Sequence, residues 1–202
     1  MSVCLIKEYT GIPFDRDEIL RYAGCRSQSE EISALAEECI KEAENVFSYK
    51  VCYSVYPINI KKNKVQFPFA QVNSAYLAKK LEGCNGAVVF GATVGLGIDR
   101  LIAKYGVLSP AKAVIFQALG AERIESLCNT FNKEIKEKYK NVKPRMSPGY
   151  GDIPLKLQRD IFSALDCPRK IGLTLNESML MSPSKSVTAI IGISGDEFFE
   201  DY

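Results

Sequence analysis

The sequence NGAVVFGA, at residues 85–92, is an almost uninterrupted run of apolar residues. Such a run, rich in Val and Phe, predicts a strand that is covered on both faces. It leads into TVGLG at residues 93–97. The glycines at 91, 95 and 97 do not fit G-x-G-x-x-G spacing, so we interpret the segment as a tight turn into a helix over 98–105 rather than a phosphate loop. A buried strand followed by a helix is therefore the expected centre of the fold.

A long amphipathic helix is predicted directly after this unit. Ser109 is a residue type favoured at N-caps, and Pro110 suits the first helical position. We attribute Gly120, inside this helix, to close packing against a neighbour, with the approach of a ligand as the alternative. Up to about residue 139, apolar residues recur three or four positions apart and form one buried stripe: Ala113, Phe116, Gly120, Ile124, Leu127, Phe131 and Ile135.

Shorter elements extend the pattern on both sides. Candidate helix caps are Asp15, Ser27, Asn73 and Asp152, and Pro68 would confine the strand before it to a sheet edge. The pattern predicts an α/β fold of the α+β type, with one mixed or antiparallel twisted sheet and helices packed around it. The expected strands are 3–9, 51–60, 65–67, 172–181 and 187–193, and the remaining helices are 16–22, about 30–46, 73–81 and 155–165.

Length and composition restrict the class of protein. The chain has 202 residues, of which 47% are hydrophobic, so we expect one domain with a substantial core. Its 26 basic and 24 acidic residues argue against nucleic acid as the main partner. The most apolar stretch, residues 87–98, is too short to cross a membrane, and the N-terminus does not resemble a signal peptide. We therefore expect a cytoplasmic protein with no nucleic-acid and no membrane partner.

The absence of histidine removes several kinds of chemistry. Ser-His-Asp and Cys-His catalysis and His-ligated metals are excluded. The seven cysteines are scattered without a C-x-x-C pair, so no metal site is expected, and we interpret them as buried hydrophobes in a reducing compartment. Cys84 and Cys128 are conceivable nucleophiles of an unrelated α/β enzyme, although no partner base is evident.

The segment KPRMSPGYGD, at residues 143–152, is the candidate for a ligand site. Its two prolines stiffen the chain, and its glycines allow backbone amides to approach a ligand. Arg145 offers a planar fork that matches a carboxylate or phosphate, and Tyr150 adds a flat ring with a weak acid. A plain connector rich in Pro and Gly is the alternative that these residues leave open.

Two motifs resemble one known family. RMSPGY, at residues 145–150, resembles the Arg-x-x-x-Gly-Tyr signature of the activation domain of cobalamin-dependent methionine synthase. GLTLNESMLMSPSKSVTA, at 172–189, is similar to the Gly-hydrophobic-x-Leu-Thr-Glu-Ser and Met-x-Pro-x-x-Ser-Val-Ser-Gly segment of that family. The resemblance runs from about Gly86 to Ser194 and points to a short, free-standing form. It implies one activation-like domain over 1–202, with a weakly matched part at 1–83 and a core that binds S-adenosylmethionine at 84–202.

The resemblance implies a role in reactivation. In that family the cobalt(I) of methionine synthase is occasionally oxidised to cobalt(II), and the domain brings S-adenosylmethionine over the corrin while a reductant supplies one electron. The implied cofactors are S-adenosylmethionine and a cobalamin supplied by a partner protein, because a chain without histidine cannot donate the lower cobalt ligand. The implied partners are a cobalamin-binding methionine synthase chain or another corrinoid protein, and an electron donor such as flavodoxin. The chain would be an accessory component of this methyltransferase.

The resemblance also assigns roles within the loop. Arg145 would pair with the methionyl carboxylate of S-adenosylmethionine, and Ser147 and Gly149 would line the pocket. Tyr150 would belong to the S-adenosylmethionine site and also lie near the corrin face as the catalytic residue, with a loop tyrosine packed on the core as the alternative.

Three further residues are implied outside the loop. Glu125, on the long helix, is the candidate for the ammonium group of the ligand, although the ungapped position is Ser126. Ile191 and Gly192 occupy the place of an aromatic pair that contacts the nucleoside in the family, so that only backbone contacts could remain there.

Two other functions stay open. The altered pair Ile191-Gly192 and the short C-terminus are compatible with a module that docks on a corrinoid protein but no longer binds S-adenosylmethionine. An unrelated soluble α/β enzyme that uses a thiol or a carboxylate is the third possibility.

Overall fold

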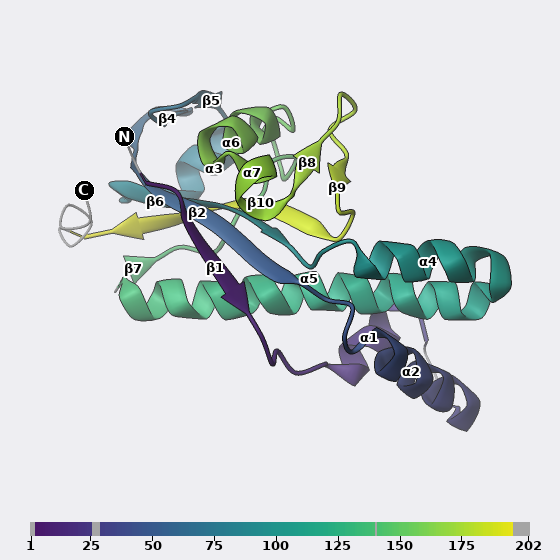
Figure 1. Cartoon of the computed structure of the whole chain (residues 1–202). Coiled ribbons are helices and arrows are strands. Elements are labelled where there is room, and N and C mark those ends of the chain that lie inside the picture. The colour runs from purple at the N-terminus through teal and green to yellow at the C-terminus, as the bar shows by residue number, and fades with distance from the viewer. Residues whose placement is uncertain (1–2, 26–28, 140, 196–202) are drawn as a thin grey trace.

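The computed structural model describes residues 3–25, 29–139 and 141–195. The predicted central strand is β6 (Gly86–Thr93), and each of its residues is buried. It lies in the middle of a five-stranded sheet with the order β1-β2-β6-β10-β7, in which all neighbours are antiparallel. The prediction of an α+β fold with helices around a mixed or antiparallel twisted sheet is confirmed, and two smaller sheets accompany the main one (Figure 1). The other strands are β1 (Leu5–Tyr9), β2 (Tyr49–Pro57), β7 (Asn141–Val142) and β10 (Ser186–Ser194).

One face of this sheet packs on the long helix α5 (Pro110–Lys138), whose apolar stripe was predicted (Figure 1). The helix extends beyond the sheet, where α1 (Arg16–Tyr22), α2 (Glu30–Ala43) and α4 (Gly97–Leu108) pack near it. Gly120 lies at a close approach, since a Cβ there would stand 2.9 Å from Cγ of Lys185 and 3.1 Å from Cγ1 of Ile98. Tight packing therefore explains this glycine.

The opposite face carries a second core beneath short elements. The small sheet β3-β4-β5 and the hairpin β8-β9 lie on this side with three short helices (Figure 1). The strands are β3 (Asn59–Lys61), β4 (Lys64–Gln66), β5 (Gln71–Asn73), β8 (Thr174–Leu175) and β9 (Met181–Ser182), and the helices are α3 (Ala75–Lys80), α6 (Leu157–Leu165) and α7 (Cys167–Ile171).

Three strand predictions are corrected by the structure. The expected strand 51–60 divides into β2 and β3, and β4 lies in the middle of its sheet rather than at an edge, because it ends at Gln66, before Pro68. The expected strand 172–181 is instead the hairpin β8-β9. Its turn is closed by Asn176, which accepts a hydrogen bond from the amide of Leu180 at 2.9 Å, with Met179 at a positive φ of 63°.

Helix caps are partly reassigned. Asp15 caps α1 as predicted, with its side chain accepting from the amide of Glu18. Ser29, rather than Ser27, caps α2, and Ser27 lies outside the described residues. Ser74, rather than Asn73, caps α3.

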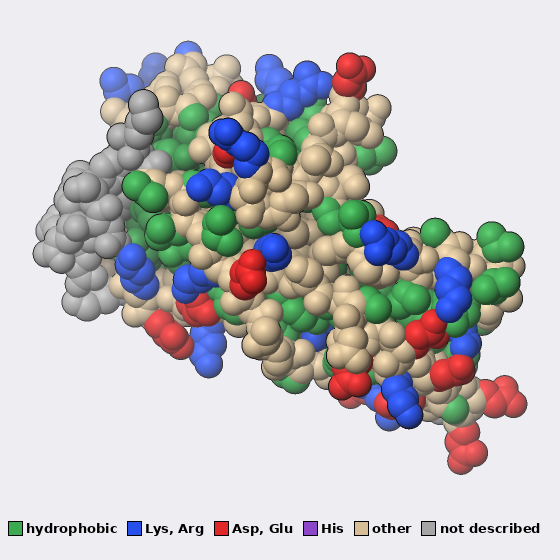
Figure 2. All heavy atoms as spheres, in the orientation of Figure 1, with side chains coloured by type: hydrophobic (Ala, Val, Ile, Leu, Met, Phe, Trp, Pro, Cys, Tyr) green, Lys and Arg blue, Asp and Glu red, His purple; other side chains and the backbone are tan. Residues whose placement is uncertain are grey.

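The surface shown in Figure 2 carries basic and acidic side chains in close mixture, with apolar side chains between them. Within residues 3–25, 29–139 and 141–195, no helix is long and apolar enough to cross a membrane. The same residues contain no group of three or more His, Cys, Asp or Glu that could hold a metal ion.

Candidate functional site

The loop with Arg145 is fixed to the edge of the main sheet. The amide of Lys143 donates to the carbonyl of Gly192 on β10 at 2.8 Å. Further along the loop, the amide of Met146 donates to the carbonyl of Ile190 at 2.9 Å, and the amide of Ile190 donates to the carbonyl of Met146 at 2.8 Å. Arg145 stands between these two anchored residues. The strand β10 thus determines the position of its backbone.

The side chain of Arg145 reaches from this loop to α5. Its guanidinium forms an ion pair with Glu125 and donates from Nη1 to Oδ1 of Asn129 at 3.2 Å. The side chain of Arg145 is 20% exposed and that of Glu125 is 41% exposed. The structure therefore brings together the two residues to which the resemblance assigned the carboxylate and the ammonium group of one ligand.

The same geometry separates Glu125 from its alternative on the helix. Ser126 donates from its hydroxyl to Glu122 at 2.6 Å and so takes part in a different contact. Asn129 was missed by sequence reasoning, yet it lies four positions after Glu125. Residues at this spacing share one face of a helix, so the spacing is a signal that could have found it.

The predicted pocket residues Ser147 and Gly149 lie in a compact turn with Tyr150. The amide of Tyr150 donates to the carbonyl of Ser147 at 3.1 Å, and the amide of Gly149 donates to Ile153 at 2.9 Å. Gly149 adopts a φ of +87°, a conformation that other residues rarely adopt. Tyr150 is 65% exposed, which contradicts the alternative of a tyrosine packed on the core.

Asp152 binds the first turn of α3, next to the N-cap Ser74, and the prediction that it caps α6 is wrong. Its carboxylate accepts hydrogen bonds from the hydroxyl of Ser74, from the amide of Ala75 at 2.9 Å and from the amide of Tyr76 at 3.2 Å. The hydrogen bond from Ser74, followed by those from the two amides, lowers the pKa of Asp152 below its usual value. The end of the loop is therefore tied to a helix from a distant part of the chain.

Ile191 and Gly192 offer no open side-chain surface. Ile191 is 1% exposed and faces the core beneath α5. A Cβ on Gly192 would stand 2.6 Å from Cδ2 of Leu81 and 2.8 Å from Sγ of Cys84. No ring could occupy either place without movement of these neighbours, so a ligand could meet this pair only through the backbone.

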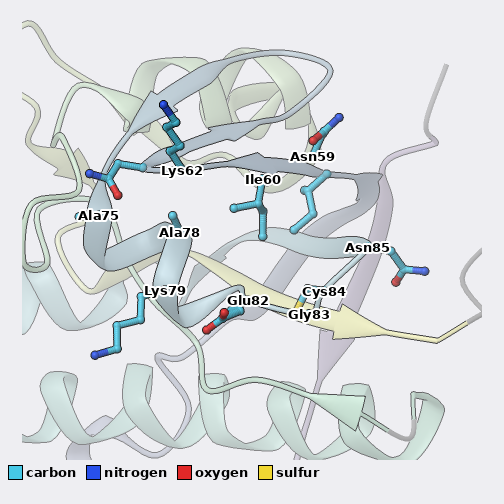
Figure 3. A pocket seen from close by; sticks show the side chains of 12 residues that line it. Asn59, Ile60, Lys62, Ala75, Ala78, Lys79, Glu82, Gly83, Cys84 and Asn85 are labelled. Carbon is cyan, nitrogen blue, oxygen red and sulfur yellow. The ribbon is translucent and has the colours of Figure 1, made fainter.

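An open hollow of 650 Å³ lies between β3, α3 and the segment before β6 (Figure 3). Cys84 belongs to its wall. Its lysines, Lys62 and Lys79, extend in opposite directions, so they do not converge on one bound group (Figure 3). We assign no ligand to this hollow.

Burial raises the pKa of two further groups on α1 and α5, the Tyr22 hydroxyl and the Cys128 thiol. Tyr22 of α1 lies near Glu125, and burial, followed by the carboxylates of Glu18 and Glu125, raises the pKa of its hydroxyl. Burial raises the pKa of the Cys128 thiol to about 12, which removes it as a nucleophile at neutral pH.

The fold can be compared with that of known domains. A solved structure of the MetH reactivation domain bound to AdoHcy is similar over 96% of this chain and 79% of that chain, with a TM-score of 0.69 and 15% sequence identity. The fold is therefore that of a reactivation domain. Residues 120–198 match the family described as vitamin B12 dependent methionine synthase, activation domain. The resemblance to this family is confirmed, and no curated protein matches the chain. The matched part contains Glu125, Arg145 and Tyr150.

Proposed function

We propose that the chain binds S-adenosylmethionine at Arg145 and Glu125 and serves in the reactivation of a cobalamin-dependent methionine synthase. The observation that carries the proposal is the ion pair between these residues, which come from a loop and a helix and meet at the sheet edge. The similar fold of a domain bound to AdoHcy supports the same class of ligand.

The pair matches the amino-acid end of the ligand in charge. Among the described residues, the guanidinium of Arg145 donates to Glu125 and Asn129, and its remaining N–H groups suit a carboxylate. The carboxylate of Glu125 is half-exposed and can accept from an ammonium group. Ser147 and Gly149 would border the ligand through their turn, and Tyr150 would contact the ligand with one side of its ring and present the exposed side toward the corrin.

In this proposal the chain supplies placement, and the bound S-adenosylmethionine supplies the methyl group. The cobalamin belongs to a partner protein, because this sequence has no histidine for the lower ligand of cobalt. A cobalamin-binding methionine synthase chain or another corrinoid protein is the proposed partner, with an electron donor such as flavodoxin, all in the cytoplasm. We propose that residues 1–202 act as one activation-like domain in this role.

Calorimetric titration with AdoHcy tests the site directly. Wild type should bind, and Arg145→Ala should bind at least about tenfold more weakly, since a hydrogen bond to a charged group contributes about 1.5–3 kcal/mol. Arg169→Ala is the matched control, because Arg169 also forms an ion pair, with Asp166, but lies on α7. Equal affinity of wild type and Arg145→Ala would reject the assigned site.

A second function is favoured by the environment of Ile191 and Gly192. Because neither residue can place a ring against a nucleoside, the chain could dock on a corrinoid protein without binding the methyl donor. This function predicts complex formation with a cobalamin protein and no heat of binding with AdoHcy. Formation of methylcobalamin from S-adenosylmethionine and a reductant would exclude it.

A further inference from the structure

The exposed ring of Tyr150 has one described aromatic neighbour, Tyr76 of α3. The ring centroids are 6.1 Å apart, and the planes are inclined by 42°. Offset and tilted ring pairs at this distance attract each other beyond the area that they bury. An exposed aromatic side chain on a loop would otherwise exchange between rotamers. The contact with Tyr76 therefore restricts the orientation of Tyr150.

The backbone around both tyrosines reinforces this contact. The carboxylate of Asp152 accepts from the amide of Tyr76 at 3.2 Å, so the residue that follows the Tyr150-Gly151 pair holds the first turn of α3. Gly151 has a φ of +59°, and a Cβ there would stand 3.0 Å from Cγ of Tyr76. A larger residue at 151 would adopt a strained backbone and press on the ring of Tyr76, so glycine suits this close approach.

A cation also fixes the ring of Tyr76. The ammonium group of Lys80, one turn further along α3, lies 5.5 Å from the centroid of that ring. An ammonium group over the face of an aromatic ring is attracted by the ring's quadrupole. Tyr76 is thus held by Lys80, by Asp152 and by the shape of Gly151, and it can serve as a fixed support.

We propose that Tyr76 is a positioning residue of the ligand site. It holds the ring of Tyr150 in one orientation within the loop that carries Arg145, and so reduces the entropy that this ring loses when a ligand binds. The inference rests on the proposed function, since the ligand is AdoHcy or S-adenosylmethionine. It extends the site to α3, which lies outside the family match at 120–198.

The test compares two substitutions of Tyr76 in the full chain. Tyr76→Leu removes the ring and should weaken AdoHcy binding about three- to tenfold, the effect of leaving one side chain to be ordered on binding. Tyr76→Phe keeps the ring and should restore wild-type affinity. Phe69→Leu is the matched control, because Phe69 lies in the loop between β4 and β5 and packs against Tyr56 and Phe67 rather than against Tyr150. Thermal unfolding confirms that each variant is folded at the temperature of titration.

A spectroscopic measurement separates positioning from general stability. The NMR chemical shifts of the Tyr150 ring protons should change in Tyr76→Leu and in Gly151→Ala, and should be unchanged in Phe69→Leu. Wild-type affinity in Tyr76→Leu, or equal weakening in Tyr76→Phe, would overturn the inference while Arg145→Ala still loses binding. Absence of AdoHcy binding by wild type would instead overturn the proposed function, and the inference with it.

Discussion

Glu122 and Glu125 lie about one turn apart on α5, and each forms an ion pair with an arginine. The two pairs differ in how much of their charged groups remains available to a ligand. Glu122 and Arg123 are 1% and 0% exposed at their side chains. Glu125 and its partner Arg145 are 41% and 20% exposed. The first pair is closed within the protein, whereas the second opens at the edge of the sheet.

The partners of Arg123 explain why its pair is structural. Its guanidinium donates to the carbonyl of Ile12 at 2.8 Å and to that of Pro13 at 2.6 Å, and it lies 4.2 Å from the ring centroid of Phe14. Burial alone would lower the pKa of Arg123, but hydrogen bonds to Glu122 and Tyr49 outweigh it and raise that pKa. All directions of the fork are therefore occupied by the protein itself.

The difference shows how glutamates on one helix can serve folding in one pair and remain available to a ligand in the other. A buried charge needs partners in every direction, so its hydrogen bonds are consumed in folding. A half-exposed pair keeps donors and acceptors for a ligand, and it contributes little to stability because water screens it. The two pairs should thus respond oppositely to substitution.

The largest expected effect concerns the closed pair. Arg123→Met removes the cation paired with the buried Glu122 and the donor to two carbonyl groups, and should lower the free energy of unfolding by about 3–5 kcal/mol. Urea denaturation measures this loss. The double variant Glu122→Leu/Arg123→Met should lose less than the sum of the two single variants, because no unpaired charge remains. A loss below about 1 kcal/mol for Arg123→Met would remove the contrast between the pairs.

The open pair should affect binding rather than folding. Glu125→Gln keeps the shape of the side chain but removes its charge, and should weaken AdoHcy binding about tenfold, with a change in unfolding free energy of about 0–1 kcal/mol. Calorimetry and urea denaturation of one preparation measure both. Ser126→Ala is the matched control, since its hydroxyl serves Glu122. Stability loss without loss of affinity would show that the second pair is also structural.

A smaller effect is expected at Asn129. Its Oδ1 accepts from Arg145 at 3.2 Å, at the long end for a hydrogen bond, so Asn129→Ala should weaken AdoHcy binding only about two- to fivefold. Asn132→Ala is the control, because Oδ1 of Asn132 has no hydrogen-bond partner among the described residues. An effect of Asn129→Ala as large as that of Glu125→Gln would mean that the amide, too, contacts the ligand.

Local patterns predicted the parts of the fold that depend on periodicity. The run that became β6 and the apolar stripe of α5 needed only the spacing of buried residues. The hairpin β8-β9 was missed because its turn at Asn176–Met179 lacks an Asn-Gly or Asp-Gly pair, and Met179 adopts a positive φ without one. Turns that tertiary packing imposes leave little trace in a local pattern.

Residues of the candidate site could be predicted only where a motif or a helical spacing indicated them. Arg145 and Tyr150 stood in a motif, and Asn129 could have been found from its distance to Glu125. The tie from Asp152 to α3 could not, because the partners are about 77 positions apart in the chain and a carboxylate before a helix suggests the nearer cap. The contact of Tyr76 with Tyr150 could not be predicted for the same reason, since the two residues lie far apart in the sequence.

The smallest effect is expected for the titration of Asp152, which should leave AdoHcy affinity unchanged near neutral pH. Its pKa is lowered in the folded protein, so the carboxylate keeps its hydrogen bonds above the usual aspartate pKa of about 3.9 and loses them as pH falls through its lower folded value. The amide resonances of Ala75 and Tyr76 should therefore titrate with a midpoint below about 3.9. In Asp152→Asn this titration should disappear. A midpoint near neutral pH would contradict a lowered pKa, and would show that the charge of Asp152 is not what holds the loop to α3.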